Sequence, residues 1–147
     1  KIKYFGRGPV ESYVDKRHAS RMGLFETTVS EHFEHYVHPQ ENMAHTDTHF
    51  AAITSETGHG LLFTKAEKPF SFNASHYSVH EITRARHDYE LEKSELTYVN
   101  IDYKHNGIGS GSCGPEAQPP YKFDEKEFSF SFKIIPTFIN NVCPFEY

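Results

Sequence analysis

Tryptophan is absent from the 147-residue sequence, and methionine and cysteine occur only twice each. Cys113 and Cys143 are too few for a disulfide framework, and they lack the paired CxxC spacing of a structural zinc site or a redox motif. Because free thiols are typical of a reducing compartment, we predict a cytoplasmic location. No apolar run approaches the roughly 20 residues that cross a bilayer, and no charged start leads into an apolar signal segment. We therefore expect a soluble chain.

Basic charge is also scarce. Lys and Arg total 15 against 20 Asp and Glu, which gives a formal net charge of −5. No run of Lys and Arg exceeds two residues, so the electrostatic footprint of a nucleic-acid-binding protein is missing. We expect neither a nucleic acid nor a membrane surface as a partner.

Aromatic residues dominate what is present, with 13 Phe and nine Tyr. A core built from rings and β-branched side chains favours sheets. The length fits one domain, and no linker or repeat divides it, so we predict a single domain over residues 1–147. The chain starts without Met in a segment, 1–5, that already reads as a strand, and we expect an excised fragment of a larger protein.

The clearest strand pattern lies near the end, where Phe128, Phe130, Phe132 and Ile134 alternate with polar residues and predict a strand over 128–134. Short apolar or alternating segments predict further strands, and Gly58-His59-Gly60 predicts a hairpin turn. These segments are 22–29, 33–37, 47–54, 60–64, 70–73 and 98–103. Short strands at close spacing predict an all-β fold.

One segment departs from the β pattern, and another has no regular pattern. Val79, Ile82, Ala85 and Tyr89 recur at helical intervals after a candidate N-cap, Ser78, which predicts one short helix. Residues 106–115, followed by two prolines, are too rich in Gly and Pro for a helix or a strand and predict a long loop. Long loops on a rigid sheet often carry function.

Eleven His residues suggest a metal site, with His32, His35 and His38 as one group and His45 with His49 as another. On a strand, positions three or four apart do not share a face, so this spacing does not bring ligands together. We favour solvated or hydrogen-bonded histidines and assign no metal ligand.

Three other signals have ordinary structural explanations. The glycines of the loop follow a strand without opening a helix, so a phosphate-binding loop is disfavoured. Cys113 could be a nucleophile, but the sequence places no base beside it. Glycoside hydrolysis needs facing carboxyl groups at about 5–10 Å, and pairs such as Glu11 with Asp15 or Glu41 with Asp47 occur in any acidic chain. Turn and salt-bridge roles are favoured for these acids.

Several segments together resemble the C-terminal region of large bacterial β-galactosidases of glycoside hydrolase family 2, up to about Ile135. They are Tyr4-Phe5-Gly6-Arg7-Gly8-Pro9-Val10-Glu11-Ser12-Tyr13-Val14-Asp15, continuing to Ala19 and Gly23, then Tyr36-Val37-His38-Pro39-Gln40-Glu41-Asn42, Phe70-Ser71-Phe72-Asn73-Ala74-Ser75-His76-Tyr77-Ser78, Asn100-Ile101-Asp102 and the loop ending Ser112-Cys113-Gly114-Pro115.

The resemblance implies an antiparallel, galactose-mutarotase-like β-sandwich that ends a multidomain, homo-oligomeric, retaining β-galactosidase acting on terminal β-D-galactosides such as lactose. The catalytic glutamates of such enzymes lie on a (β/α)8 barrel, which alone needs about 250 residues. No catalytic residue is therefore assigned to this chain, and the fragment alone is predicted to be inactive. The resemblance also implies Mg and Na in the parent enzyme, bound outside this region, with no cofactor in this domain.

In such enzymes the loop matching 106–115 reaches over the barrel mouth and places a Trp against the bound sugar. Cys113 takes that position here, so the sequence departs from the pattern. The resemblance makes Cys113, Ser112, Gly114 and Asn106 candidate substrate-binding residues. At a second departure, where relatives commonly carry Gly and then Arg after residues 41–42, this chain has Met43-Ala44-His45. Glu41 and His45 are weaker candidates for the loop edge, equally explained by an ordinary hydrogen-bond network.

Two other functions stay open at this point. A stand-alone carbohydrate-binding or aldose-epimerase-like module would share the sandwich and would need a convergent His/Glu pair. A purely structural interface domain would make no sugar contact through Cys113. Residues 136–147 lie past the resemblance and have no predicted role.

Overall fold

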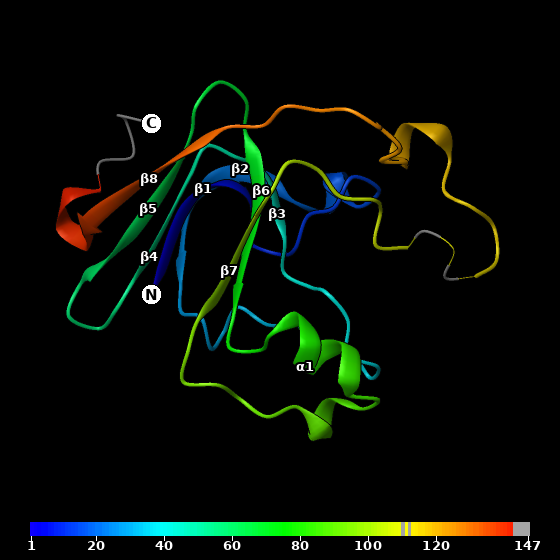
Figure 1. Cartoon of the computed structure of the whole chain (residues 1–147), viewed down its shortest axis with the longest axis horizontal. Helices are drawn as coiled ribbons and strands as arrows, with labels where there is room; N and C mark the ends of the chain where they lie inside the picture. Colours follow the sequence, from blue (N-terminus) through cyan, green and yellow to red (C-terminus); the bar gives the residue numbers. More distant parts are fainter. Residues whose placement is uncertain (110, 112, 143–147) are drawn as a thin grey trace.

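The structure, a computed structural model, describes residues 1–109, 111 and 113–142, which form eight strands and one short α-helix. The strands form two antiparallel sheets of five and three strands (Figure 1). The predicted all-β sandwich with one short helix is confirmed. None of the helices in the described part is long and apolar enough to cross a membrane.

The larger sheet has the strand order β2-β1-β4-β5-β8. Its strands are β1 (Ile2–Gly8), β2 (Arg21–Thr27), β4 (Phe50–Thr54), β5 (His59–Lys65) and β8 (Phe132–Phe138). Residues of β1 alternate between buried and half-buried, as a strand covered mainly on one face should. β8 forms one edge of this sheet and exposes Ile134 and Ile135.

The smaller sheet has the order β3-β6-β7, from β3 (His45–Thr48), β6 (Phe70–Ser75) and β7 (Tyr98–Asp102). Every residue of β6 is buried, because this strand is central in its sheet and packs against the larger one. Aromatic and aliphatic side chains of both sheets meet in one core. Its buried members are Ile2, Tyr4, Val29, Ala51, Phe63, Phe70, Phe72 and Ala74.

The predicted strand 47–54 is in fact two strands in different sheets, β3 and β4. The chain crosses at His49, whose N–H donates to Phe5 O (2.9 Å) and whose carbonyl accepts from Lys65 N (2.8 Å). Just before the crossing, Asp47 has a φ of 55°, and the pairing of β3 with β6 shifts register between His45 and Thr48. Asp tolerates this left-handed conformation better than most residues, so the strand can turn here.

Of the other predicted strands, one is absent and one begins later than predicted. Segment 33–37 forms no strand: Glu34 N donates to Asn42 Oδ1 at 3.1 Å and Tyr36 N donates to Glu34 O at 3.0 Å, so neither N–H joins a ladder. The strand predicted over 128–134 begins only at Phe132. The Phe128 and Phe130 rings pack on Tyr103 instead, with ring centroids 4.9 and 5.9 Å away, so the alternation continues into an aromatic cluster outside the sheet.

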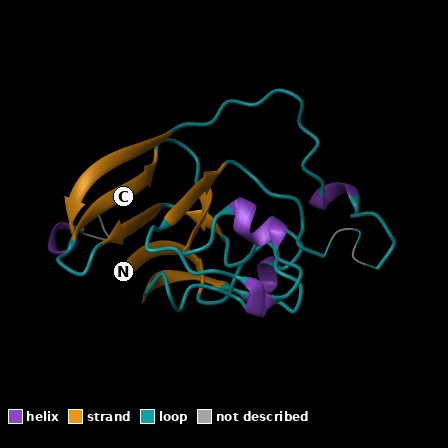
Figure 2. Cartoon of the chain, turned by 60° about the horizontal axis from the view of Figure 1, so that its bottom comes forward, coloured by secondary structure: helices purple, strands orange, loops and turns teal. Residues whose placement is uncertain are grey.

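The predicted helix exists as α1 (Val79–Arg84), and Ser78 Oγ accepts from Glu81 N at 3.1 Å as an N-cap. It stops short of Tyr89, which lies in the 3-10 turn η2 (Asp88–Glu90). Figure 2 shows most of the helical segments within the loops that connect the strands. The connection from β7 to β8 swings away from both sheets and contains η3 (Pro119–Tyr121) (Figure 1).

Candidate functional site

The segment that follows β1 is held by a buried carboxylate, Glu11, which is 3% exposed. It accepts hydrogen bonds from Lys16 Nζ, from the Tyr36 hydroxyl at 2.5 Å and from Met43 N at 3.0 Å. Burial acts to raise the pKa of Glu11, but these three donors together lower it. Glu11 is therefore an ionised anchor that joins segment 9–20 to the chain before β3.

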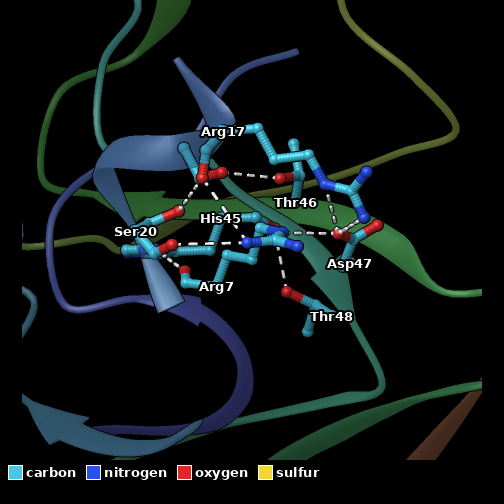
Figure 3. A network of polar contacts seen from close by, with 8 residues as sticks. Arg7, Arg17, Ser20, His45, Thr46, Asp47 and Thr48 are labelled. Carbon is cyan, nitrogen blue, oxygen red and sulfur yellow. Dashed lines mark hydrogen bonds and ion pairs between the residues drawn. The ribbon is translucent and has the colours of Figure 1, made fainter. Parts of the chain in front are cut away.

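A second carboxylate, Asp47, also holds this segment, through Arg17 (Figure 3). Asp47 Oδ2 accepts from Arg7 Nε at 2.6 Å and from an Arg17 guanidinium nitrogen at 2.7 Å. Burial acts to raise the pKa of Asp47, and the two guanidinium groups outweigh it and lower the pKa. These ion pairs join Asp47 in β3 to Arg7 in β1 and to the chain around Arg17.

Two histidines form a buried pair between the sheets. His32 Nε2 and His45 Nε2 lie 2.7 Å apart, His32 Nδ1 lies 2.9 Å from the carbonyl oxygen of Ala74, and His45 Nδ1 lies 2.7 Å from that of Arg7. Burial lowers the pKa of both rings, that of His45 to about 3. Because the His45 side chain is 0% exposed, it offers no accessible atom to a sugar in this structure, and a structural role explains it better than the predicted substrate contact.

A third histidine, His105, lies just after β7 and meets two carboxylates. Its Nε2 is 3.1 Å from Glu41 Oε1 and 3.3 Å from Asp102 Oδ2, and the Tyr13 ring lies edge-on at 5.7 Å. Burial alone would lower the pKa of His105, but the two carboxylates raise it to about 9. The ring is therefore an imidazolium at neutral pH. Its Nδ1 is buried without a hydrogen-bond partner among the described residues.

His105 also lines three clefts of about 440 to 460 Å³. One of them opens beside the start of the glycine loop. Its lining includes Tyr13, Glu41, His105, Asn106, Gly107 and Ile108. This cleft brings together an ion pair, an aromatic ring and the start of the glycine loop, and polar groups in a cleft can fix the orientation of a ligand.

The raised pKa of His105 gives a pH-dependent stability. A histidine with a folded pKa of about 9 binds its proton more tightly when folded, so its stabilisation is complete below the unfolded pKa near 6.5 and is lost as the pH rises through 9. We expect the His105→Gln variant to lose about 2 kcal/mol of this pH-dependent stability. Urea unfolding of both proteins between pH 6 and pH 10 checks it. If the unfolding free energies of the two proteins changed equally with pH, the folded chain would bind no additional proton at His105.

The structure brings some of the predicted substrate-binding residues together. Glu41 and Asn106 line the same cleft, and Asn106 Oδ1 accepts from Phe123 N at 2.7 Å. Cys113 is a free, exposed thiol, and Gly114, with a φ of 99°, donates from N to Gly111 O at 3.3 Å. Ser112 lies outside the described residues. A sugar contact from any of these residues stays a prediction.

Sequence reasoning missed His105 and Asp102 as members of the site. In the sequence Asp102 belongs only to a motif, although an Asp and a His three residues apart at the end of a strand are a local signal. Glu41 lies far away in the sequence, and only the fold brings it to His105. The described residues contain no group of three or more His, Cys, Asp or Glu that could hold a metal ion.

Comparison with known proteins shows the family of the chain. Residues 1–134 match the family described as "Beta galactosidase small chain". The chain belongs to this β-galactosidase small-chain family. It is 43% identical over 134 residues to a β-galactosidase of Actinobacillus pleuropneumoniae, 39% over 133 residues to one of Staphylococcus xylosus and 38% over 134 residues to one of Kluyveromyces lactis.

These matches cover most of the chain but little of the relatives. They include 90 to 91% of this chain and 13% of each relative. The chain therefore corresponds to a small part of large enzymes. The β-galactosidase small-chain match ends at residue 134, within β8.

Proposed function

We propose that the chain is the non-catalytic small-chain domain of a retaining, family 2 β-galactosidase, and that its glycine loop contributes to the substrate site. The family match carries this proposal, since relatives named β-galactosidase align over nearly the whole chain. The substrates are terminal β-D-galactosides such as lactose. The partners are the catalytic barrel and other domains of the parent enzyme.

The carboxylates of the chain support a non-catalytic role. Retaining glycosidases need two carboxyl groups about 5–5.5 Å apart and free to act as nucleophile and acid. Glu11 and Asp47 instead form ion pairs with Lys16 and with two arginines. Glu41 and Asp102 both pair with the His105 imidazolium. The proposal places the reacting carboxylates in another part of the parent enzyme, and the Mg and Na sites as well. We also propose that the parent enzyme is a homo-oligomer and is located in the cytoplasm.

The loop supports a role in substrate binding. Cys113 is exposed at the far end of a loop whose root is fixed by Asn106 and bordered by the His105 cleft. A thiol in place of an indole removes a stacking surface and leaves the sugar a weaker contact at this point.

The Cys113→Trp variant of the parent enzyme tests this role. We expect a 2- to 10-fold change in KM for lactose, about 0.5–1.5 kcal/mol, and a changed ratio of transglycosylation to hydrolysis. Cys113→Ser is the matched control, because it keeps the small side chain and should leave both quantities close to those of the parent. If Cys113→Trp changed neither quantity, the loop would not contact the substrate.

One observation favours a second candidate, a sugar-binding or epimerase-like module. Such a module needs a convergent His/Glu pair, and His105 and Glu41 form one at 3.1 Å in a cleft. In this pair the imidazolium of His105, whose pKa is about 9, would serve as the acid and the Glu41 carboxylate as the base. NMR titration of the chain with galactose separates the two, since saturable shifts at residues 104–108 would support the module and their absence would exclude it.

A further inference from the structure

An exposed carboxylate, Asp15, holds the first part of the glycine loop. Asp15 Oδ1 accepts from Ile108 N at 3.1 Å, and Asp15 Oδ2 accepts from Gly109 N at 3.0 Å. Among the residues that the structure describes, Asp15 has no ion-pair partner, so both oxygens serve the loop backbone. A carboxylate that accepts from two backbone N–H groups makes stronger bonds than a neutral acceptor would.

The glycines of the loop make room for this carboxylate. A Cβ on Gly107 would lie 2.3 Å from Asp15 Oδ2, and a Cβ on Gly109 would lie 3.3 Å from it. The missing side chain at Gly107 is thus a steric requirement of the Asp15 contact. The glycines that resembled a phosphate loop in the sequence surround an acidic side chain of the same protein.

Asp15 is itself held in place on its C-terminal side. Its neighbour Lys16 pairs with buried Glu11, and Lys16 N donates to Tyr13 O at 3.0 Å. The next residue, Arg17, pairs with Asp47. The carboxylate therefore lies on a segment that is fixed to β1 and β3. Its hydrogen bonds to Ile108 N and Gly109 N hold the loop next to this segment.

Farther along, the described residues show only local support for the loop, such as the bond from Gly114 N to Gly111 O. Asp15 is thus the last side chain in the described structure that holds the loop before Cys113. We propose that Asp15 is a positioning residue, which sets the path of the loop at Ile108 and Gly109 and thereby places Cys113 in the substrate site. This inference rests on the function proposed above, and small displacements of a substrate contact have large kinetic effects.

The first test needs no substrate. In the chain, Asp15→Ala should accelerate hydrogen exchange of the Ile108 and Gly109 amides by about tenfold or more, because their acceptor is removed. Asp15→Asn keeps one acceptor oxygen and should show an intermediate effect. Asp124→Ala is the matched control, since Asp124 is exposed on the long connection after β7 and has no polar contact with the described residues. Melting temperatures confirm that each variant is folded.

Gly107 provides an independent variant. In the wild-type background, Gly107→Ala should displace the carboxylate and accelerate exchange at the same two amides as Asp15→Ala does. In the Asp15→Ala background the clash is absent, so adding Gly107→Ala should have little further effect. Additive effects of the two substitutions would contradict a direct contact.

The second test uses the parent enzyme. We expect Asp15→Ala to raise KM for lactose about 3- to 10-fold with kcat within about twofold, with Asp15→Asn between it and the wild type. If exchange at both amides equals that of Asp124→Ala, Asp15 does not hold the loop and the inference is wrong. If exchange rises but KM changes only in Cys113→Trp, the loop contact does not depend on Asp15, and the inference is again wrong. If KM changes in neither variant, the proposed function fails as well.

Discussion

Acidification from pH 7 to pH 4 should reduce the free energy of unfolding by about 3 kcal/mol through His45 alone. The pKa of His45 is about 3 in the folded chain, because the ring is fully buried, and near 6.5 when unfolded. Below pH 6.5 the unfolded chain therefore binds a proton that the folded chain does not, and stability falls. His32, whose pKa burial also lowers, adds to the loss.

Urea unfolding at pH 7, 5.5 and 4 measures this loss. The interval from pH 6.5 to pH 5 is the most informative, because Glu11 and Asp47 add their own losses only at lower pH, where carboxylates are protonated. His45→Gln should flatten the curve in this interval, whereas His80→Gln, at an exposed position of α1, should leave its slope unchanged. A rise in stability on acidification would contradict the prediction and would mean that the two Nε2 atoms share an added proton.

The Phe72→Ala variant should lose about 3–5 kcal/mol of unfolding free energy. Phe72 is 0% exposed in the central strand of the smaller sheet, and its ring meets Tyr4 at 5.2 Å and His45 at 5.5 Å between centroids. Removing the ring leaves a cavity where the two sheets meet, and surrounding side chains cannot close it fully.

Chemical denaturation of Phe72→Ala beside Phe128→Ala measures this effect. Phe128 is 55% exposed and stacks on Tyr103 outside the sheets, so its loss should cost about 1 kcal/mol or less. Both phenylalanines lie in alternating segments of the sequence, and only the structure shows that Phe72 is buried and Phe128 is exposed. Equal losses in the two variants would show that Phe72 is not part of a tightly packed core.

The sequence supports predictions where local chemistry decides the outcome. Ser78 and Glu81 predict the start of α1, which needs only a cap three residues before a backbone N–H. Aromatic residues in alternation predict the buried strand β6. Segment 106–115, too rich in Gly and Pro for a ladder, forms no helix or strand at its described residues.

Prediction from the sequence fails where contacts between distant segments decide the structure. Phe128 and Phe132 look alike in the pattern, but only Phe132 faces β5, because the partner strand lies far away along the chain. His45 looks like a candidate for the loop edge until His32 and β6 bury it. Asp15 and Gly107 carry separate signals, a turn acid and a flexible loop, and their contact exists only in the fold.

The position of β8 at the edge of the larger sheet bears on self-association. An edge strand presents unpaired backbone groups that can template pairing with another molecule, and exposed Ile134 and Ile135 make such pairing more favourable. Pro136, which lies opposite Leu61, follows these two isoleucines in β8. Because proline has no backbone N–H, it interrupts the row of donors along the strand. A proline at this position therefore limits how far an intermolecular sheet could grow from β8.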